Sequence, residues 1–426
     1  MQVKNHQQQL IDSFKQVRQQ SLALTTHLET EDYELQADVF VSPLKWHLAH
    51  TSWFFETFLL KQQVHGYQEF HPQFEYLFNS YYNAVGQQYP RDKRGLMSRP
   101  TVTEVKAYRQ YVDQKLIHWL EQETHLDPDI EALITLGLNH EQQHQELMLT
   151  DLKYCFSFNP LYPIYHNPKF PKDYDPSQHN RSTPLSFIEF GGGIESFGHK
   201  GDGFAFDNEG PQHQFLLNDF AIANRLVTNE EFLAFVQDGG YQNPMLWLSD
   251  GWAWVQQQRI SSPLYWQQEM EEQFEFRLSG YGKLHPQQPV THISFYEADA
   301  YARWAGKRLP SEYEWEIASK KQPLAGHFAD RKLFHPQAAN PEFDGELQQL
   351  FGDCWEWTQS TYSPYPGFKP AAGAVGEYNG KFMSNQMVLR GGSCATPAGH
   401  IRNTYRNFFY PQDRWQFTGI RLAQDV

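Results

Sequence analysis

Two histidines, His140 and His144, stand four residues apart in a stretch whose apolar residues recur at helical spacing. On a helix this spacing places both imidazoles on one face, one turn apart, which suits two ligands of a single metal ion. Surface and cap histidines also occur at this spacing, so the pair alone leaves both interpretations open. The segment 140–144 reads HEQQH and also matches the H-E-x-x-H of zinc proteases, in which Glu141 would be the general base.

An earlier helical stretch carries two further histidines, His47 and His50, among apolar residues. A single histidine on such a face is more often a packed core residue, but beside a helix that carries a histidine pair it becomes a candidate third ligand. His50 is favoured over His47 because the apolar Trp53 and Phe54 follow it and would lie near the bundle interior. Zinc proteases usually have their third ligand downstream, and no convincing continuation follows Glu146. The sequence therefore favours a three-histidine metal site that includes His50.

Length and charge limit the class of protein. The chain has 426 residues, which predicts two domains, and a formal net charge of −15, which argues against nucleic acid as a main partner. Local clusters of arginine are nevertheless compatible with a small anionic substrate. No apolar run approaches membrane-spanning length, and the N-terminal residues lack a signal-peptide pattern. Three widely spaced cysteines fit a reducing compartment, so a cytoplasmic location without membrane attachment is expected. The sequence does not indicate an oligomeric state.

The elements that must position the histidines are helices. Apolar periodicity predicts four of them in the first third of the chain, at 6–28, 42–62, 101–123 and 128–155, and long connections suggest an up-and-down bundle. Beyond a stretch without periodicity come short strand-like runs, many glycines and tryptophans, and two convincing helices, at 228–237 and 295–305. We therefore expect a helical domain followed by an α+β domain. The expected division is 1–160, a linker at 161–184, and 185–426.

The surroundings of the histidines resemble a known family. The run WHLAHT at 46–51, followed about ninety residues later by HEQQHQE at 140–146, resembles the DinB-like domain of the ergothioneine-type sulfoxide synthases. The resemblance implies a DinB-like four-helix bundle and a site for non-haem Fe(II) on His50, His140 and His144. Three neutral imidazoles would leave positions on Fe(II) for a thiolate, an imidazole and dioxygen. Cu(II) or Zn(II) would compete for these ligands, so iron is implied by the resemblance alone.

The second half of the chain resembles the formylglycine-generating-enzyme (sulfatase-modifying-factor) domains, which have a C-type-lectin-like fold. Matching runs follow the family's order, among them GGG at 191–193, GDCWEWT at 352–358, RGGS at 390–393 and FTGIR at 417–421. These residues are interpreted as structural. The true formylglycine-generating enzymes resembled here use a copper-binding cysteine pair after the Gly-Gly-Ser, and here Cys394 has no such partner. The domain is therefore expected to supply pocket walls while iron in the first domain does the chemistry.

Two tyrosines and two arginines of the first domain are candidates for the reaction. Tyr81 and Tyr82 stand where one subgroup of the family keeps its active-site tyrosines, although adjacent tyrosines are more often packing residues. A phenol near the iron can donate a proton or hydrogen atom and so direct the reaction to C–S bond formation. Arg91 and Arg94 are candidates for gripping the carboxylate of the sulfur donor, because a guanidinium pairs with a carboxylate in two bonds. The alternative for these arginines is a solvated loop of alternating charge.

The resemblance also implies residues that hold hercynine, the trimethylated betaine of histidine. Gln143 and Tyr365 match positions that hold the betaine carboxylate. Asn407 matches a residue that meets the trimethylammonium group, and the neighbouring ring of Phe408 suits that cation. Phe409 stands where actinobacterial members have an aspartate, which could pair with the extra amino group of a γ-glutamyl donor. Its absence favours free cysteine as the sulfur donor.

Together these features predict an enzyme that joins hercynine and cysteine with O2 at the imidazole C2, giving hercynylcysteine S-oxide in ergothioneine biosynthesis. One alternative keeps the architecture and changes the substrates to γ-glutamylcysteine, to histidine as in the ovothiol route, or to a selenium donor such as a selenosugar. A second is a zinc-dependent thiol transferase of the DinB superfamily. A third is a non-enzymatic sugar or peptide binder built on the lectin-like domain.

Overall fold

The computed structural model describes residues 2–168, 183–201, 203–343 and 345–426. The chain divides into two compact units. The first comprises Met1–Leu161 with Ala371–Tyr378, and the second comprises Tyr162–Pro370 with Asn379–Val426. The short segment Ala371–Tyr378 therefore groups with the helices, whereas the sequence assigned it to the second domain. Most of the expected linker, 161–184, lies outside the described residues.

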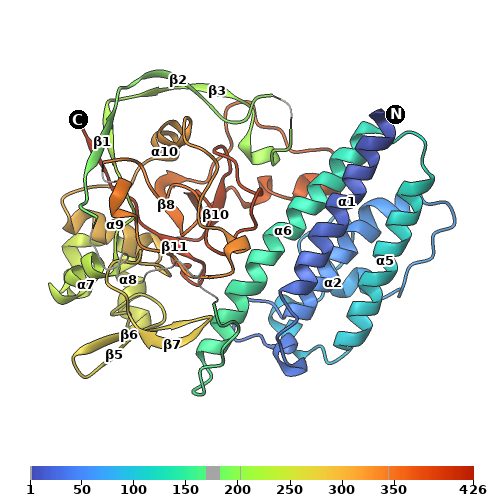
Figure 1. Ribbon diagram of the computed structural model, residues 1–426, viewed down its shortest axis with the longest axis horizontal. Helices are drawn as coiled ribbons and strands as arrows, with labels where there is room; N and C mark the ends of the chain where they lie inside the picture. The colour runs from blue at the N-terminus through green and yellow to red at the C-terminus, as the bar shows by residue number, and fades with distance from the viewer. Residues whose placement is uncertain (1, 169–182, 202, 344) are drawn as a thin grey trace. The chain divides into compact units, whose positions relative to one another are not determined.

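Four long helices build the first unit, which confirms the predicted helical bundle (Figure 1). Their starts follow from local chemistry. The side chain of Thr101 accepts a hydrogen bond from the Glu104 N–H, and the Glu104 carboxylate accepts one from the Thr101 N–H. Asp127 caps the last helix, with a proline at its first position. The helices are α1 (Gln2–Ala23), α2 (Leu44–Phe55), α5 (Val102–Gln122) and α6 (Pro128–Ser157).

Helix α2 lies at the centre of the bundle. All twelve of its residues are buried, and it packs against α5 and α6. A helix that is covered on every side must be largely apolar, so its two histidines need partners inside the bundle. The helix continues through one π-helical turn, Glu56–Leu60, into the short α3 (Lys61–Gln63), and α4 (Phe74–Phe78) follows. Single π turns inside helices are frequent beside functional sites.

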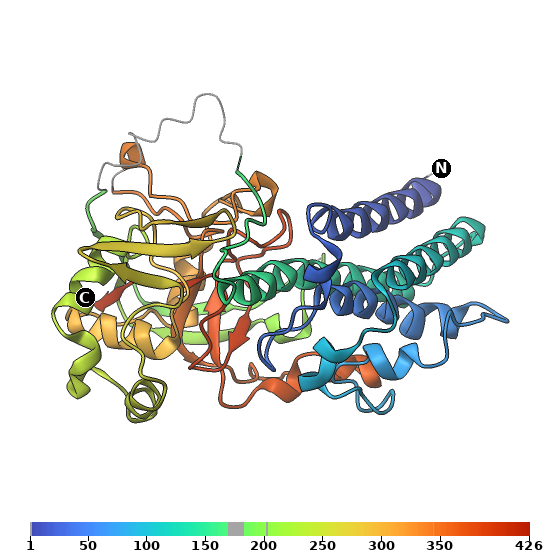
Figure 2. The ribbon, with the colours of Figure 1, turned by 90° about the horizontal axis from the view of Figure 1, so that it is seen from below.

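The second unit is a mixed fold of short strands and helices, which confirms the predicted α+β class (Figures 1 and 2). Its largest sheet has the order β10–β9–β8–β11, in which β11 runs parallel to β8 and the other neighbours are antiparallel. The other sheets are β1–β4–β12, β2–β3 and β5–β6–β7, all antiparallel. The strands are β1 (Phe187–Phe190), β2 (Gly193–Phe197), β3 (His213–Leu217), β4 (Phe220–Ala223), β5 (Trp266–Glu269), β6 (Glu272–Arg277), β7 (Gly280–Lys283), β8 (Trp355–Thr361), β9 (Met387–Arg390), β10 (Asn407–Phe409), β11 (Thr418–Gly419) and β12 (Ala423–Asp425).

The second unit has two helices that the sequence did not predict. Besides α7 (Asn229–Gln237) and α9 (Phe295–Trp304), it contains α8 (Ser249–Gln258) and α10 (Glu312–Ser319). Helix α10 escaped detection because its buried positions include glutamates. Each of these carboxylates pairs with an arginine outside the helix, two of them distant in sequence, and apolar periodicity does not report such partners. The pairs are Glu312–Arg406, Glu314–Arg308 and Glu316–Arg390.

Glu356 shows why the WEW run of β8 is structural. Its carboxylate accepts hydrogen bonds from Nε and Nη2 of Arg421, each at 2.8 Å, and from the indole Nε1 of Trp315 at 2.8 Å. Both Glu356 and Arg421 are completely buried. A buried carboxylate with all of these donors is part of the core, so the structural interpretation of this run is supported.

In the described part of the chain no helix is both long and apolar enough to cross a membrane.

The nearby Asp353 generates a prediction on stability. This carboxylate accepts a hydrogen bond from the Gln337 N–H at 2.8 Å, in a left-handed backbone conformation with φ of 54°, and burial raises its pKa from 3.8 to about 7. A raised pKa means that its contribution to stability is complete below pH 3.8 and is lost as the pH rises to 7. Asparagine keeps an acceptor oxygen, tolerates this conformation and carries no charge.

We therefore expect the free energy of unfolding of Asp353→Asn to increase, relative to that of the wild type, as the pH rises. The difference between the two proteins should grow by about 2–3 kcal/mol from pH 5 to pH 7, since one pKa unit corresponds to about 1.4 kcal/mol. Urea unfolding at several pH values measures it. A difference that stays constant with pH would contradict the assignment.

Candidate metal centre

Three histidines from two helices meet inside the first unit. His50 comes from α2, and His140 and His144 come from α6. One nitrogen of each lies within 4.8 Å of the corresponding nitrogens of the other two, and all three side chains are buried. The structure thus brings together the three residues that the sequence selected as metal ligands.

The ring of His50 is fixed on three sides. Its Nδ1 donates a hydrogen bond to the carbonyl oxygen of Phe78 at 2.6 Å, which leaves Nε2 as the acceptor nitrogen. Trp46 and Trp53 stack on the ring, with centroids 4.6 and 5.4 Å away and planes within 13° of parallel. The Nε2 atom is buried and has no hydrogen-bond partner among the described residues. A hydrogen bond from the other ring nitrogen, such as this one to the Phe78 carbonyl, fixes the orientation of a metal-binding imidazole.

His140 has the least satisfied side chain of the three histidines. Both of its ring nitrogens are buried without a hydrogen-bond partner in the described structure. Burying a polar nitrogen without a partner costs free energy, so such groups require an explanation. A metal ion bound between the three rings would satisfy the free nitrogens of His50 and His140 together. The residues therefore fit a metal that prefers imidazole ligands.

The three rings are neutral in this environment. Burial lowers the pKa of His140 to about 3, and it lowers the pKa values of His50 and His144 well below the usual 6.5. The neighbouring histidines lower the pKa values of His50 and His144 further. Neutral imidazole is the form that binds metals, so at neutral pH no proton has to leave before a metal enters.

His47 lies behind the cluster and is not one of the three. Its Nδ1 lies 2.8 Å from Nδ1 of His144, and its Nε2 lies 3.1 Å from Oδ2 of Asp151. His144 thus uses Nδ1 toward His47, which leaves Nε2 for a metal. The preference for His50 over His47 in the sequence agrees with this geometry.

Glu141, the residue that a zinc protease would use as its base, turns away from the histidines. Its carboxylate accepts hydrogen bonds from Arg18 at 2.8 Å, from Arg109 and from the Ser21 hydroxyl. These contacts tie α6 to α1 and α5. Although burial alone raises it, Arg109 and Arg18 lower the pKa of Glu141 to about 2. A carboxylate held between two guanidinium groups is an ion-pair anchor, so the arrangement does not fit a general base.

Tyr378 is a tyrosine beside the cluster that the sequence analysis missed. Its ring contacts that of His140 edge to face, with centroids 5.5 Å apart, and its hydroxyl donates a hydrogen bond to Oε1 of Gln143. The preceding Glu377 accepts hydrogen bonds from the backbone N–H groups of Asn83 and Ala84, at 3.1 and 2.8 Å. No local signal in the sequence relates this segment to α6, because the two are more than two hundred residues apart.

The predicted tyrosines lie next to this segment. Tyr81 is half-buried, and its ring lies 4.6 Å from that of Tyr82 and 6.3 Å from that of Tyr378. Tyr82 is completely buried against Trp53 and Phe58. Burial raises the pKa of Tyr82 well above its usual value. Tyr81 therefore lies between Tyr82, a packed residue, and Tyr378.

The two predicted arginines have different surroundings. Arg91 is exposed and donates a hydrogen bond to the carbonyl of Phe40 at 2.6 Å. Arg94 is buried, and its guanidinium lies 3.5 Å from the ring centre of Trp46, the indole that stacks on His50. Its hydrogen bonds go only to the hydroxyls of Ser42 and Ser80. In the described residues no carboxylate forms an ion pair with Arg94, so this cation has the capacity for an anionic ligand.

The remaining predicted residues belong to the second unit, except Gln143. Tyr365 is buried there, donates to Oε2 of Glu312 at 3.1 Å and lies under Arg406, so its hydroxyl is engaged within the unit. The three others form β10 and are half-buried: the side chain of Asn407 accepts from the N–H of Phe408, which stacks on Tyr362, and Phe409 contacts Trp415. A role for these residues toward a substrate stays a prediction.

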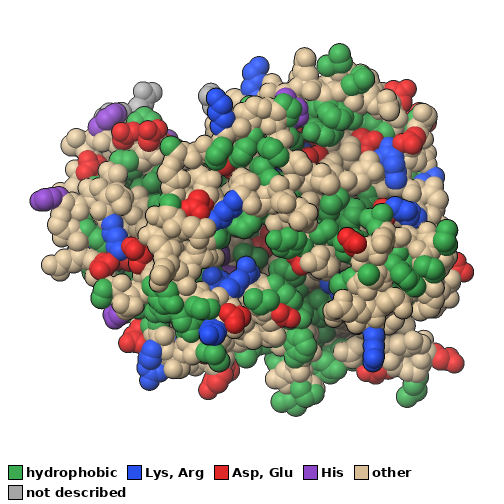
Figure 3. All heavy atoms as spheres, turned by 180° about the vertical axis from the view of Figure 1, so that it is seen from behind, with side chains coloured by type: hydrophobic (Ala, Val, Ile, Leu, Met, Phe, Trp, Pro, Cys, Tyr) green, Lys and Arg blue, Asp and Glu red, His purple; other side chains and the backbone are tan. Residues whose placement is uncertain are grey.

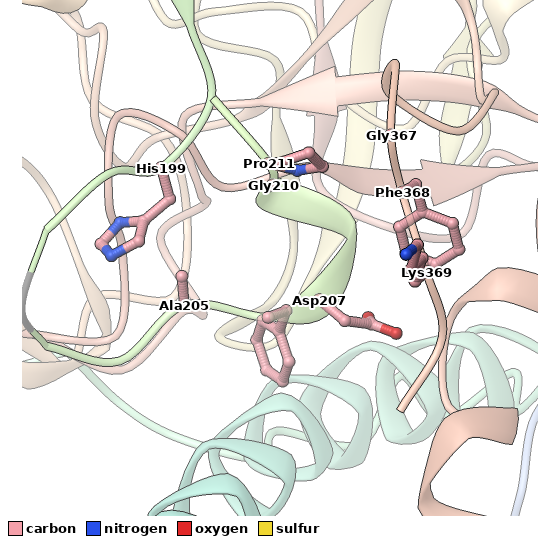
Figure 4. A pocket seen from close by; sticks show the side chains of 9 residues that line it. His199, Ala205, Asp207, Gly210, Pro211, Gly367, Phe368 and Lys369 are labelled. Atoms are coloured by element: carbon pink, nitrogen blue, oxygen red, sulfur yellow. The ribbon is translucent and has the colours of Figure 1, made fainter. Parts of the chain in front are cut away.

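A separate pocket of about 390 Å³ lies in the second unit. Its walls come from His199, 205–207, 210–211 and 367–369 and combine the rings of Phe206 and Phe368 with the charged Asp207 and Lys369 (Figure 4). None of the residues selected from the sequence lines it.

On the face drawn in Figure 3, basic and acidic side chains are interspersed.

Comparison with known proteins defines the class. The DinB superfamily matches residues 13–148, and the sulfatase-modifying factor enzyme 1-like domain matches 173–342 and 327–426. The chain thus joins a DinB-type bundle to a formylglycine-generating-enzyme-like domain. The hercynine oxygenases of Mycolicibacterium smegmatis and Mycolicibacterium thermoresistibile are each 30% identical to it, covering 98% of this chain and 99% and 94% of those proteins. That of Mycobacterium tuberculosis is 29% identical, covering 94% and 95%. The chain therefore belongs to the hercynine oxygenase family, which confirms the resemblance to the sulfoxide synthases.

The Glu141 anchor yields a prediction on stability. Glu141→Ala should lower the free energy of unfolding by about 3–5 kcal/mol, because it leaves the buried Arg109 without its carboxylate and leaves Arg18 with Asp113 alone. Glu131→Ala is the matched control on the same helix, since Glu131 pairs only with the exposed His6 and should lose less than about 1 kcal/mol. Urea unfolding measures both, and equal losses in the two variants would contradict the anchor.

Proposed function

We propose that this chain is a non-haem Fe(II) enzyme that joins hercynine and cysteine with O2 to give hercynylcysteine S-oxide. The observation that carries the proposal is the buried group of three neutral imidazoles, His50, His140 and His144. The hercynine oxygenases that align over nearly the whole chain support the choice of hercynine as substrate. In the balanced reaction one oxygen atom enters the sulfoxide and the other leaves as water with the hydrogens of the imidazole C–H and the thiol.

The metal must be a redox metal for this reaction. The ligands would be the Nε2 atoms of His50 and His144 with one nitrogen of His140. Fe(II), when bound there, supplies the electron transfer to O2 that Zn(II), which has no redox chemistry, cannot supply. A zinc-dependent thiol transferase of the DinB superfamily is the alternative that the same ligands would serve.

Arg94 is the residue we assign to the carboxylate of the sulfur donor. Its guanidinium is buried beside Trp46 and pairs with no carboxylate of the described residues, and burial lowers its pKa well below the usual value. An incoming carboxylate would form an ion pair with this guanidinium through two hydrogen bonds. Arg91 is exposed and begins the short 3-10 helix Arg91–Leu96 that also carries Arg94, and it would attract the same group. With Phe409 in place of an aspartate, free cysteine is the expected donor.

Tyr378 is the tyrosine that we assign to proton donation. Its phenol lies beside His140, and Gln143 Oε1 holds the hydroxyl proton in a defined direction. A positioned phenol can deliver that proton while the C–S bond forms. Tyr81, which contacts Tyr378, would support its orientation, whereas the packing of Tyr82 suits a structural role. Gln143 remains an expected contact of hercynine, and the roles of Asn407 and Phe408 stay predictions from the sequence.

Metal dependence tests the proposal directly. Anaerobic loading with Fe(II), followed by hercynine, cysteine and O2, should consume oxygen and give the sulfoxide, with γ-glutamylcysteine a poorer donor. His140→Ala and His144→Ala should each lose bound iron and turnover by at least about 100-fold, because two ligands do not retain the ion. His118→Ala, an exposed histidine on α5, is the control and should behave as the wild type.

Two results would overturn this proposal. Full activity in His144→Ala would remove that residue from the ligands. A purified protein that retains zinc, ignores Fe(II) and consumes no oxygen with any thiol would instead favour the transferase.

Removal of the phenol tests the proton donor. Tyr378→Phe should retain iron, because no ligand changes, and divert cysteine toward its sulfinate by about 10-fold or more, since general acid catalysis contributes about 10²–10⁴-fold. Tyr81→Phe and Tyr82→Phe are the matched comparisons. Chromatography of the products gives the ratio of sulfoxide to sulfinate. The same diversion in Tyr82→Phe, with none in Tyr378→Phe, would return the role to the tyrosine pair.

A further inference from the structure

A chain of two hydrogen bonds leads away from His144 into the bundle. His144 Nδ1 lies 2.8 Å from Nδ1 of His47, and His47 Nε2 lies 3.1 Å from Oδ2 of Asp151. The same carboxylate oxygen accepts the backbone N–H of Ser42 at 2.9 Å. All three side chains of the chain are at least nine-tenths buried. His47 and Asp151 are separate from the three histidines proposed as ligands.

The direction of the protons follows from the chemistry of the end group. An ionised carboxylate only accepts hydrogen bonds, so Nε2 of His47 must be the donor to Asp151. A neutral imidazole carries one N–H, and therefore Nδ1 of His47 is an acceptor. Among the described residues its hydrogen-bond partner is Nδ1 of His144, which must then donate. His144 then has its lone pair on Nε2, the nitrogen that it can offer to a metal.

We propose that His47 and Asp151 are positioning residues that hold His144 in its metal-binding tautomer. The inference rests on the proposed metal centre. Without an acceptor at Nδ1, the isolated imidazole of His144 would populate both tautomers, and the tautomer protonated at Nε2 cannot bind. Partners of this kind fix the tautomer and orientation of metal-binding histidines, and their loss typically weakens metal affinity 10–100-fold.

The placement of the relay on the helices strengthens the argument. His47 precedes His50 by three residues on α2, and Asp151 follows His144 by seven on α6, so each lies on the same helix face as a proposed ligand. The Ser42 N–H, just before α2, is fixed by the same carboxylate. The relay therefore joins the two helices that supply the ligands, at the level of the ligands.

Two substitutions of His47 separate positioning from packing. Asparagine places its side-chain oxygen near the former Nδ1, so His47→Asn keeps an acceptor for His144 and loses the link to Asp151. His47→Leu fills the buried space with an apolar group and offers no acceptor. We expect the wild type to bind Co(II) and Fe(II) most tightly, His47→Asn a few-fold more weakly and His47→Leu about 10–100-fold more weakly. Anaerobic competition with a chromophoric chelator measures the affinities without any substrate.

Asp151→Asn tests the far end of the relay. It keeps an oxygen that can accept from Ser42 and His47 but removes the charge, so an affinity loss of about 10-fold is expected, together with a changed visible absorption spectrum of bound Co(II). Glu56→Gln is the matched control, because Glu56 is a buried carboxylate of the same unit whose partners are Tyr67, Tyr108 and the Phe70 N–H. It should alter stability and leave metal affinity within about 2-fold.

The outcomes distinguish the relay from the metal centre. Wild-type protein that binds neither Co(II) nor Fe(II) would overturn the proposed centre and the relay with it. Wild-type binding that His47→Leu retains would overturn the relay alone. An affinity of His47→Leu above that of His47→Asn would also overturn it, since buried packing favours leucine whereas the relay requires the acceptor. The expected order, with Glu56→Gln unchanged, supports the relay.

Discussion

The burial of three imidazoles with free nitrogens directed at one another is the constraint on which the first unit depends. A polar nitrogen without a partner is costly in a protein interior, and His140 alone contributes two. The surroundings hold the rings in place despite this cost. Indole rings enclose His50 on both faces, the Phe78 carbonyl fixes its Nδ1, and His47 fixes the Nδ1 of His144. A metal ion is the group that would satisfy the remaining nitrogens at once.

The carboxylates near the three histidines in sequence are bonded to other residues of the bundle. Glu141 is next to a proposed ligand in sequence, yet its carboxylate is paired with Arg18 and Arg109. Asp151 is linked to His144 through His47. Arg94 is buried beside Trp46, the indole that stacks on His50, and within the described residues its hydrogen bonds go to hydroxyls. An anionic ligand would therefore find a cation beside the histidines.

The local parts of this site were predictable from sequence and the long-range parts were not. The spacing of His140 and His144 on a helix, and His50 on an apolar helix, identified the cluster, and apolar periodicity identified the helix at 101–123. Tyr378 could not be found, because its place beside His140 depends on how residues 371–378 join the helical unit. Helix α10 was missed for a related reason. Its buried glutamates are stable only with arginines from distant segments, and no periodicity reports such pairs.

Many polar residues of the second unit have structural roles. Its core depends on buried ion pairs such as Glu356–Arg421, and removing one partner of such a pair is strongly destabilising, so these residues are constrained whatever the domain does. A reactive cysteine has the opposite requirement, because it needs access and a lowered pKa. Cys354 and Cys394 are completely buried, which suits packing. The physical requirements of metal chemistry, which are neutral ligands with unsatisfied nitrogens, are met instead by the histidines of the helical unit.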